Sequence, residues 1–447
     1  MVPDLLVESV LSGCLVWRPS GRFFVSLALH WAAPCQWLLS IAKLLMQVQQ
    51  CVDGRFVKFL IDFPNPHDGS AARLRHGFGP PLRSLAAHVP EQVRGVLDAV
   101  QQAAQAGLWC LGWVRYEAAA AFDAAYAGAL HATPPGEPLA WFAVFDGPRP
   151  WPEDADADAV KTGPQVQSQV QSQVQWQPGL ERADFDAAIA RIHEAIAAGD
   201  CYQINYTAQF MGRLLGDIPS LFAALRRAQP GGYVACMDSG DEQVLSVSPE
   251  LFFDWDGERI LTRPMKGTAP RGATPAQDEA NVQAMRSSPK ERAENVMIVD
   301  LLRNDVSRIA EPFSVQVPRL FHAEPLPTVW QMTSDVQART RPGTGLADVF
   351  AALFPCGSIT GAPKRQAMRL IHELESGPRG VYCGAVGVVR PGTTAGRVHA
   401  TFNVPIRTVV ARGTELRCGI GSGITSGAEA PAEWQEWRHK RAFLDKV

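Results

Sequence analysis

One lysine, Lys266, lies in the segment LTRPMKGTAPRG (261–272), between a proline and a glycine. The apolar run VLSVSPELFFDWDGERI (244–260) before it predicts two strands joined by a turn at Asp256-Gly257. We therefore expect Lys266 where a strand ends. A lysine that is partly desolvated or close to other cations loses its proton more easily, and the neutral amine is a nucleophile or a base. A solvated loop lysine is the plainer alternative, but the residues that follow favour a lysine with a catalytic role.

Glutamates at helical spacing are the second candidate group. The segment KERAENVMIVDLLRNDVSRI (290–309) predicts a helix with Glu294 on an otherwise apolar face. In AEAPAEWQEWRHKRAFL (428–444), Glu433 and Glu436 are three residues apart and share a helix face. Surface salt bridges are one explanation. Three converging glutamates without His or Cys would instead suit a hard cation such as Mg²⁺, which prefers oxygen ligands.

Two glycine-rich segments and one arginine complete the candidates. PCGSITGAPKRQAMRLI (355–371) predicts a loop that opens a helix, and helix N-termini attract anions. It does not match the nucleotide phosphate-loop pattern. CGIGSGITSG (418–427) predicts a second loop, whose amides could cradle a carboxylate. Arg407, in the predicted strand FNVPIRTVV (402–410), has apolar neighbours and would pair with a carboxylate. The alternatives are that these segments are only tight turns and that Arg407 forms a structural salt bridge. Taken together, the glycine-rich segments, the arginine and the glutamates predict a site for a small multi-anionic acid.

The elements that must position these residues are helices interspersed with strands. They show no regular strand–helix–strand alternation, so the pattern favours an α+β fold. One predicted helix begins with Asp184 as a possible N-cap and ends at Gly199. Other predicted helices cover 90–106 and 220–228, and predicted strands cover 55–63, 139–148 and 201–210.

Composition places the chain among globular enzymes. It has 447 residues, of which 46% are hydrophobic, which is enough for one large domain or two. The net charge of −3 gives no electrostatic case for nucleic-acid binding. Nine cysteines without a CxxC pair favour reduced thiols and a cytoplasmic protein.

The chain divides into four predicted parts. Residues 1–52 are an N-terminal extension of uncertain status; polar residues interrupt their apolar stretch, so neither a membrane span nor a signal peptide is favoured. Residues 53–148 look folded. Residues 149–180 hold an acidic run and QVQS repeats, which predict a low-complexity loop or linker, although the alternating valines could form an edge strand. Residues 181–447 carry the candidate site.

The motifs PMKGTAPRG, KERAENVMIVDLLRND, FPCGSITGAPK, YCGAVGVV, PIRTV and GIGSGI…EWQEW resemble those of the chorismate-utilising enzymes, in the same order and approximate spacing. The resemblance covers Asp184 to the C-terminus, and residues 53–148 are similar to the variable N-terminal part of that family. It implies a large mixed or antiparallel β-sandwich core flanked by helices.

The resemblance also implies a reaction. At the position of Lys266, the branch that makes 4-amino-4-deoxychorismate for 4-aminobenzoate and folate has lysine, whereas the anthranilate-forming branch usually has alanine. In the first branch the amine attacks C2 of chorismate and expels the C4 hydroxyl, and ammonia then adds at C4 and releases the lysine. Gln203 stands where relatives that add water have lysine. Gln331 stands where many relatives have histidine, which further disfavours anthranilate but leaves open which group protonates the hydroxyl.

Other roles follow only from the resemblance. Mg²⁺ would be held by Glu294, Glu433 and Glu436. The substrate's second carboxylate would be held by Arg407, Tyr382 and the amides of Gly421 and Gly423. Thr268 would be a catalytic residue beside Lys266, and Thr360 and Gln203 would bind the substrate in the same pocket. The chain shows no glutaminase signature, so we expect ammonia from a separate glutamine amidotransferase subunit. The alternatives are the anthranilate-forming branch and a catalytically silent chorismate-binding subunit.

Overall fold

The computed structural model describes residues 58–67, 72–152, 155, 174–177, 179–326 and 329–447. By its internal contacts the chain divides after Phe56, and the described residues all belong to the second part. The predicted extension 1–52 therefore lies outside the described residues, as does most of the predicted loop 149–180.

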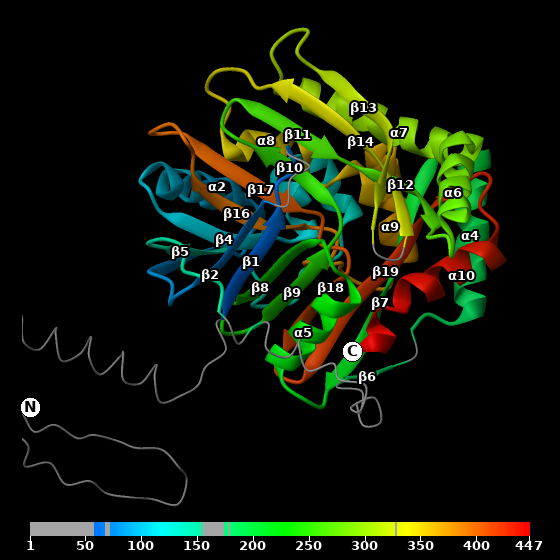
Figure 1. The fold of residues 1–447 in the computed structure, drawn as a ribbon, viewed down its shortest axis with the longest axis horizontal. Helices are drawn as coiled ribbons and strands as arrows, with labels where there is room; N and C mark the ends of the chain where they lie inside the picture. The colour runs from blue at the N-terminus through cyan, green and yellow to red at the C-terminus, as the bar shows by residue number, and fades with distance from the viewer. Residues whose placement is uncertain (1–57, 68–71, 153–154, 156–173, 178, 327–328) are drawn as a thin grey trace, which may run out of the picture. The chain divides into compact units, whose positions relative to one another are not determined.

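An antiparallel sheet, sheet A, carries one side of the candidate site (Figure 1). In spatial order its strands are β15 (Gly361–Ala362), β7 (Gln203–Leu214), β19 (Glu415–Thr425), β18 (Thr408–Arg412), β9 (Gln243–Ser248), β8 (Tyr233–Asp238), β1 (Phe59–Pro64) and β2 (Arg73–Phe78), with β6 (Val174–Trp176) also beside β7. Because β7 is long, β15 pairs with its beginning and β6 with its end.

A second antiparallel sheet, sheet B, carries Lys266. In spatial order its strands are β12 (Met265–Pro270), β14 (Val329–Arg339), β11 (Arg259–Arg263), β10 (Leu251–Trp255), β17 (Val398–Asn403), β16 (Ala385–Pro391), β4 (Trp109–Val114), β5 (Ala140–Phe145) and β3 (Arg83–Ala87), with β13 (Gln316–Pro325) beside β14. Strands β10 and β11 meet at Gly257, whose φ is 87°, so the predicted turn there is confirmed.

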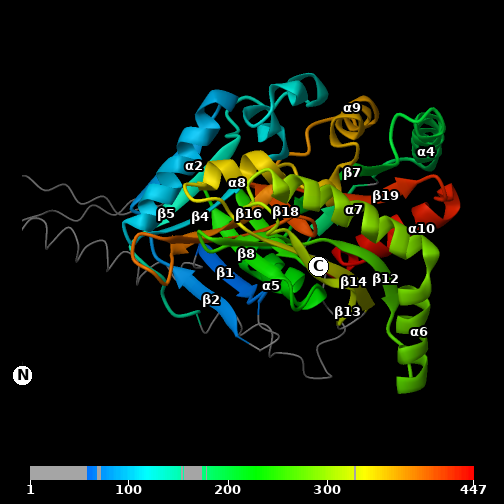
Figure 2. The ribbon, with the colours of Figure 1, turned by 90° about the horizontal axis from the view of Figure 1, so that it is seen from above.

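The two sheets pack face to face, and helices cover the outer face of sheet B (Figure 2). Strand β5 illustrates these layers, because its side chains are buried on both faces of sheet B. Trp141, Ala143 and Phe145 join the cluster between the sheets, whereas Phe142 and Val144 join the cluster under the helices. The helices of this layer are α2 (Pro90–Gln105), α7 (Pro289–Ser307) and α8 (Leu346–Leu353). The predicted α+β fold with a β-sandwich core flanked by helices is confirmed.

Further helices surround the sheet edges that carry the site. Helices α4 (Arg182–Ala197) and α10 (Ala430–Arg441) lie against β19, and α5 (Ile218–Ala228) lies against β9. Helix α6 (Pro275–Ser287) packs against β12, and α9 (Lys364–Leu374) packs against β7 and β15. None of the helices within the described residues is long and apolar enough to cross a membrane.

Three local predictions need correction. The N-cap of α4 is Glu181, and Asp184 instead lies in the first turn, where its charge favours the helix dipole. Residues 418–427, predicted as a loop, are mostly strand β19. The glycines permit its close pairing with β7, because a Cβ on Gly421 would lie 2.4 Å from the Tyr206 carbonyl oxygen. Residues 174–176, predicted within a loop, form the edge strand β6, in which Val174 is buried.

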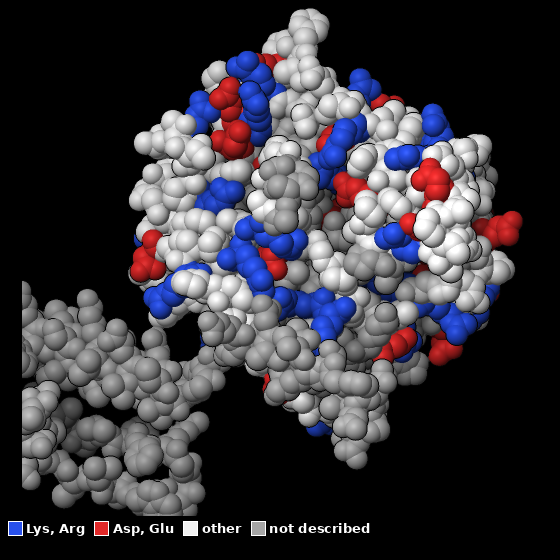
Figure 3. Space-filling view, viewed as in Figure 1, with Lys and Arg blue, Asp and Glu red and all other residues white. Residues whose placement is uncertain are grey.

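Charged side chains of both signs are interspersed over the face shown in Figure 3, with most basic groups close to acidic ones. This distribution is in keeping with the net charge of −3.

Candidate active site

Lys266 lies within β12, not at the end of a strand as predicted. The pairing of β12 with β14 shifts register between Met265 and Thr268, and such a bulge redirects a side chain. Asn295 on α7 donates to the Lys266 carbonyl at 3.4 Å, and Gln331 on β14 donates to the Gly267 carbonyl at 2.8 Å. A helix and a neighbouring strand thus fix the main chain that carries the amine.

The Lys266 amine faces β7 and β19 across the gap between the sheets. A Cβ on Gly423 would lie 3.1 Å from Lys266 Nζ and 2.5 Å from Gln203 Nε2. Gln203 is fully buried, yet neither polar atom of its amide has a hydrogen-bond partner within the described part of the chain. Buried amides are almost always paired, so Gln203 is suited to a ligand beside the lysine.

Four glutamates form one electrostatic cluster with Lys266. Burial raises the pKa of Glu294 on α7, while Lys266 opposes the rise. Burial also raises the pKa of Glu291, one turn earlier, and both Glu436 and Glu433 of α10 add to that rise. The structure therefore brings the predicted glutamates together from two helices. It adds Glu291, which is not among the residues predicted to hold the ion.

The two α10 glutamates differ in their surroundings. Glu433 is buried, and its Oε2 accepts a hydrogen bond from Ser422 Oγ at 2.8 Å. Partial burial would raise the pKa of Glu436, but Lys440, at 2.7 Å, together with Lys266 lowers it.

The donor set is chemically suited to Mg²⁺. No three His, Cys, Asp or Glu side chains within the described ranges are already close enough to coordinate an ion. The glutamates nevertheless supply several carboxylate oxygens. Neighbouring glutamates add to the raised pKa values of Glu291, Glu294 and Glu433, so a bound cation would relieve their repulsion. These side chains therefore offer oxygen ligands of the kind that Mg²⁺ prefers.

Arg407 lies in the connection between β17 and β18, with φ of 52°, and not inside a strand as predicted. Its guanidinium carbon lies 4.8 Å from the centre of the Phe443 ring, and it donates to the Lys440 carbonyl. Among the residues that the structure describes, no carboxylate pairs with it, and burial lowers its pKa. A largely buried cation without a carboxylate favours an anionic ligand.

The main chain of β19 faces the site. Lys440 Nζ donates to the Gly421 carbonyl at 2.9 Å, so the polar main-chain groups of Gly421 point away from β7. The alternation of an antiparallel ladder places those of Gly423 on the same side. The amides of these two glycines can therefore act as donors, although they belong to a strand.

Three other predicted residues are engaged elsewhere. Thr268 is exposed and donates to Gln331 Oε1 at 3.2 Å. Thr360 is fully buried and donates to the Cys356 carbonyl at 3.0 Å. The Tyr382 ring packs on β19, where a Cβ on Gly419 would lie 2.2 Å from its Cδ1.

Glu250 is a functional candidate that sequence reasoning missed. It is 4% exposed and follows β9, and burial raises its pKa to about 7. Ser358 Oγ donates to it at 2.6 Å, and both the Met265 amide and Lys266 favour its ionised form. Its only signal in the sequence is a glutamate inside the apolar run VLSVSPELFF. A carboxyl that titrates near neutrality beside an amine can supply a proton.

Comparisons with known proteins found relatives with two different named activities. The chain is 42% identical over 261 residues to "Aminodeoxychorismate synthase component 1" of Klebsiella aerogenes. The matched region covers 58% of this chain and 57% of that protein. It is 38% identical over 275 residues to "Anthranilate synthase component 1" of Streptomyces coelicolor. That match covers 61% of this chain and 53% of the relative. The chain thus spans little more than half the length of these relatives.

A solved structure of anthranilate synthase component I from Streptococcus pneumoniae has the same fold. Its TM-score is 0.66 at 24% identity, and the match covers 87% of this chain and 91% of that one. The family model described as "chorismate binding enzyme" matches residues 68–446. Since that match takes in far more than half of the sequence, the chain belongs to the chorismate binding enzyme family.

Proposed function

We propose that the protein acts as an aminodeoxychorismate synthase component I, which converts chorismate and ammonia to 4-amino-4-deoxychorismate in 4-aminobenzoate and folate biosynthesis. The observation that carries the proposal is Lys266, held by a bulged strand beside the buried Gln203 amide and the four-glutamate cluster. The similarity to enzymes of that name supports it. We also propose a cytoplasmic location.

In the proposed first step, the Lys266 amine forms a bond to C2 of chorismate. Both ring double bonds shift, and the bond from C4 to its hydroxyl oxygen breaks. Glu250 gives that oxygen a proton, so it leaves as water, and the carboxylate can take a proton from the alkylated amine. Ammonia then adds at C4, the double bonds shift back, and the C2–N bond to Lys266 breaks as Glu250 returns its proton to the departing amine. The Glu250 carboxylate then takes a proton from the new ammonium group at C4.

The remaining residues bind and orient the substrate. Arg407 and the amides of Gly421 and Gly423 would hold one carboxylate of chorismate, with Tyr382 and Thr360 forming the wall behind them. Glu294, Glu433 and Glu436, with Glu291, would hold Mg²⁺, which when bound neutralises a substrate carboxylate. Ammonia would come from a separate glutamine amidotransferase subunit; the words "component 1" in the relatives' names support a partner.

Anthranilate synthase component I is the second candidate, since relatives of that name are also similar. Lys266 and Gln331 favour the first candidate. The purified protein is incubated with chorismate, Mg²⁺ and ammonium chloride, with and without an added aminodeoxychorismate lyase, and the products are separated by chromatography. 4-Aminobenzoate that forms only with the lyase supports the proposal. Anthranilate that forms without the lyase favours the second candidate. If neither product forms, with or without the lyase, a silent binding subunit is favoured.

The variant Lys266→Ala tests the covalent step. We expect the rate of 4-amino-4-deoxychorismate formation to fall about a thousandfold or more, as is typical when a covalent nucleophile is removed. Mass spectrometry of the quenched wild-type enzyme should find an adduct on the peptide with Lys266. A wild-type rate in the variant would exclude the lysine route.

A further inference from the structure

Arg379 is a buried arginine that the proposed reaction does not use. It is 4% exposed and follows α9. Its guanidinium donates to both carboxylate oxygens of Glu375, at 2.6 and 2.9 Å, and to two main-chain carbonyls, those of Ile359 and Asn205, each at 2.7 Å. One planar group thus joins a carboxylate and two separate segments of the chain.

Both carbonyls are next to residues of the candidate site. Ile359 directly precedes Thr360, and Asn205 lies two residues after Gln203 on β7. The Asn205 amide donates to the Thr360 carbonyl at 2.8 Å, so the two segments lie side by side where β15 pairs with β7. Glu375 holds β7 as well, since its Oε1 accepts from the amide and the hydroxyl of Thr207 at 2.9 and 2.8 Å.

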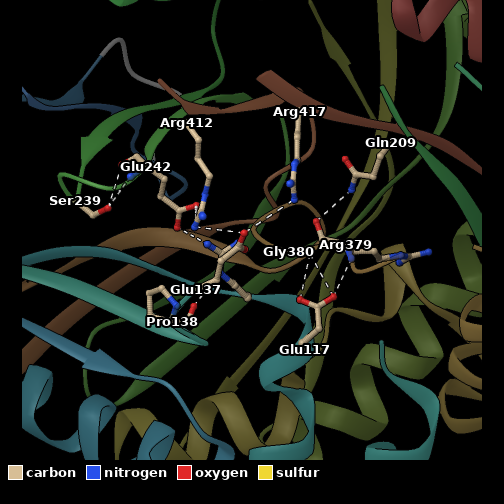
Figure 4. A network of polar contacts seen from close by, with 11 residues as sticks. Glu117, Glu137, Pro138, Gln209, Ser239, Glu242, Arg379, Gly380, Arg412 and Arg417 are labelled. Carbon is tan, nitrogen blue, oxygen red and sulfur yellow. Dashed lines mark hydrogen bonds and ion pairs between the residues drawn. The ribbon is translucent and has the colours of Figure 1, made fainter. Parts of the chain in front are cut away.

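The main chain of Arg379 is fixed from the other side. Glu117 accepts hydrogen bonds from the Arg379 amide at 2.8 Å and from the Gly380 amide at 3.1 Å (Figure 4). The Tyr116 ring lies 4.8 Å from the guanidinium carbon. Gly380 is two residues before Tyr382, so these contacts also place the turn that carries Tyr382.

We propose that Arg379, paired with Glu375, is a positioning residue that sets the place of Gln203 and Thr360 and thereby the affinity for chorismate. The inference rests on the proposed function. Arg379 touches no reacting atom. Buried ion pairs add little stability compared with apolar residues of similar size, so stability is a weak explanation for this one. A guanidinium offers five donors in a fixed plane, whereas a lysine ammonium cannot reach the same three acceptor groups.

The test compares Arg379→Lys with the matched control Arg73→Lys. Arg73 likewise pairs with a carboxylate, that of Asp62, and donates to two main-chain carbonyls, those of Asp62 and Gly232. It lies on β2, at the opposite edge of sheet A from β7. Thermal unfolding, the KM for chorismate and kcat are measured for both. We expect both variants to unfold at lower temperature and only Arg379→Lys to raise the KM, by about tenfold or more, with a smaller change in kcat. An unchanged KM in Arg379→Lys would mean a purely structural role.

Hydrogen exchange gives a readout that does not depend on the reaction. In Arg379→Lys the amides of Asn205 and Thr207 should exchange faster than in the wild type, and in Arg73→Lys they should not. If the wild type fails to bind chorismate, the proposed function fails; unchanged exchange at these amides overturns the inference separately. If Arg379→Lys does not fold, Glu375→Gln carries the same test, because it keeps an acceptor for Thr207 and loses the ion pair.

Discussion

At the scale of single residues, the proposed mechanism assigns the role of acid to Glu250 and the role of nucleophile to Lys266. Burial raises the pKa of Glu250 to about 7, so it keeps its proton below that pH and loses it above. A required acid predicts that kcat falls as the pH rises through about 7. In Glu250→Gln we expect kcat to fall about 10²- to 10⁴-fold and this limb of the pH profile to disappear. Steady-state rates from pH 5.5 to 9 measure both.

Glu258→Gln is the control for that prediction. Glu258 lies on the exposed turn between β10 and β11, where it pairs with Arg397 and Arg339. Its loss should leave the pH profile unchanged. If Glu250→Gln retains the wild-type limb above pH 7, another group protonates the leaving hydroxyl.

The prediction for Gly423 concerns space rather than charge. In Gly423→Ala the new methyl group would lie 2.5 Å from Gln203 Nε2 and 3.1 Å from Lys266 Nζ, so one of the two side chains must move. We expect kcat/KM for chorismate to fall by about tenfold or more, because small displacements of reacting groups are costly. Gly427→Ala is the matched control, since a Cβ there meets nothing within 4 Å. Equal kinetics in the two variants would show that Gln203 and the lysine have room to adjust.

The residue types of the site could be predicted from the sequence more readily than their contacts. Lys266 and the glutamates are charged groups among apolar neighbours, which a sequence reveals. Glu250 is equally charged, but a single carboxylate in a strand-like run has no partner at a fixed spacing. Its burial, which raises the pKa, arises only in the folded chain, where the hydrogen bonds from Ser358 and from the Met265 amide oppose the rise.

At the scale of elements, α7 and α10 must approach each other for their glutamates to share a cation. Helix α10 is fixed by Trp437, which donates to Ser422 Oγ at 3.0 Å and whose ring lies 5.1 Å from that of Phe185 on α4. Helix α7 is fixed through Asn295, whose Oδ1 accepts from Ser334 Oγ at 2.6 Å. Helix periodicity predicted the pair Glu433 and Glu436 and placed Glu294 on a helix face, but only tertiary packing brings α7 and α10 together.

We predict that Glu436→Gln raises the Mg²⁺ concentration for half-maximal activity by about tenfold or more and lowers kcat/KM, because a ligating carboxylate is lost. Activity is titrated against Mg²⁺ at fixed ionic strength. Mg²⁺ affinity of the wild type should also rise with pH, since the raised pKa values of Glu294 and Glu433 mean that protons compete with the cation. Glu429→Gln, at the exposed start of α10, is the control. An unchanged Mg²⁺ requirement in Glu436→Gln would exclude Glu436 as a ligand.

At the scale of the whole molecule, a buried ion cluster joins the two sheets. Arg115 follows β4 of sheet B and pairs with Glu242, which precedes β9 of sheet A, and with Glu137 at 3.0 Å. Arg412 on β18 also approaches both glutamates, at 3.3 and 3.4 Å. Arg417 also approaches Glu137, at 4.0 Å. The sequence did not predict this cluster, because most of its members are far apart along the chain and only the fold brings them together.

The cluster makes a prediction about global stability. Arg115→Met fills the same volume but leaves Glu137 and Glu242 buried with less positive charge, and breaking a buried pair in this way typically costs about 3–5 kcal/mol. Denaturant unfolding at pH 7 should therefore show a clearly lower midpoint. Arg303→Met removes an exposed pair with Asp300 on α7 and should change stability by less than about 0.5 kcal/mol. Similar midpoints for the two variants would mean that Arg412 and water compensate for Arg115, and that apolar packing between the sheets suffices to hold them together.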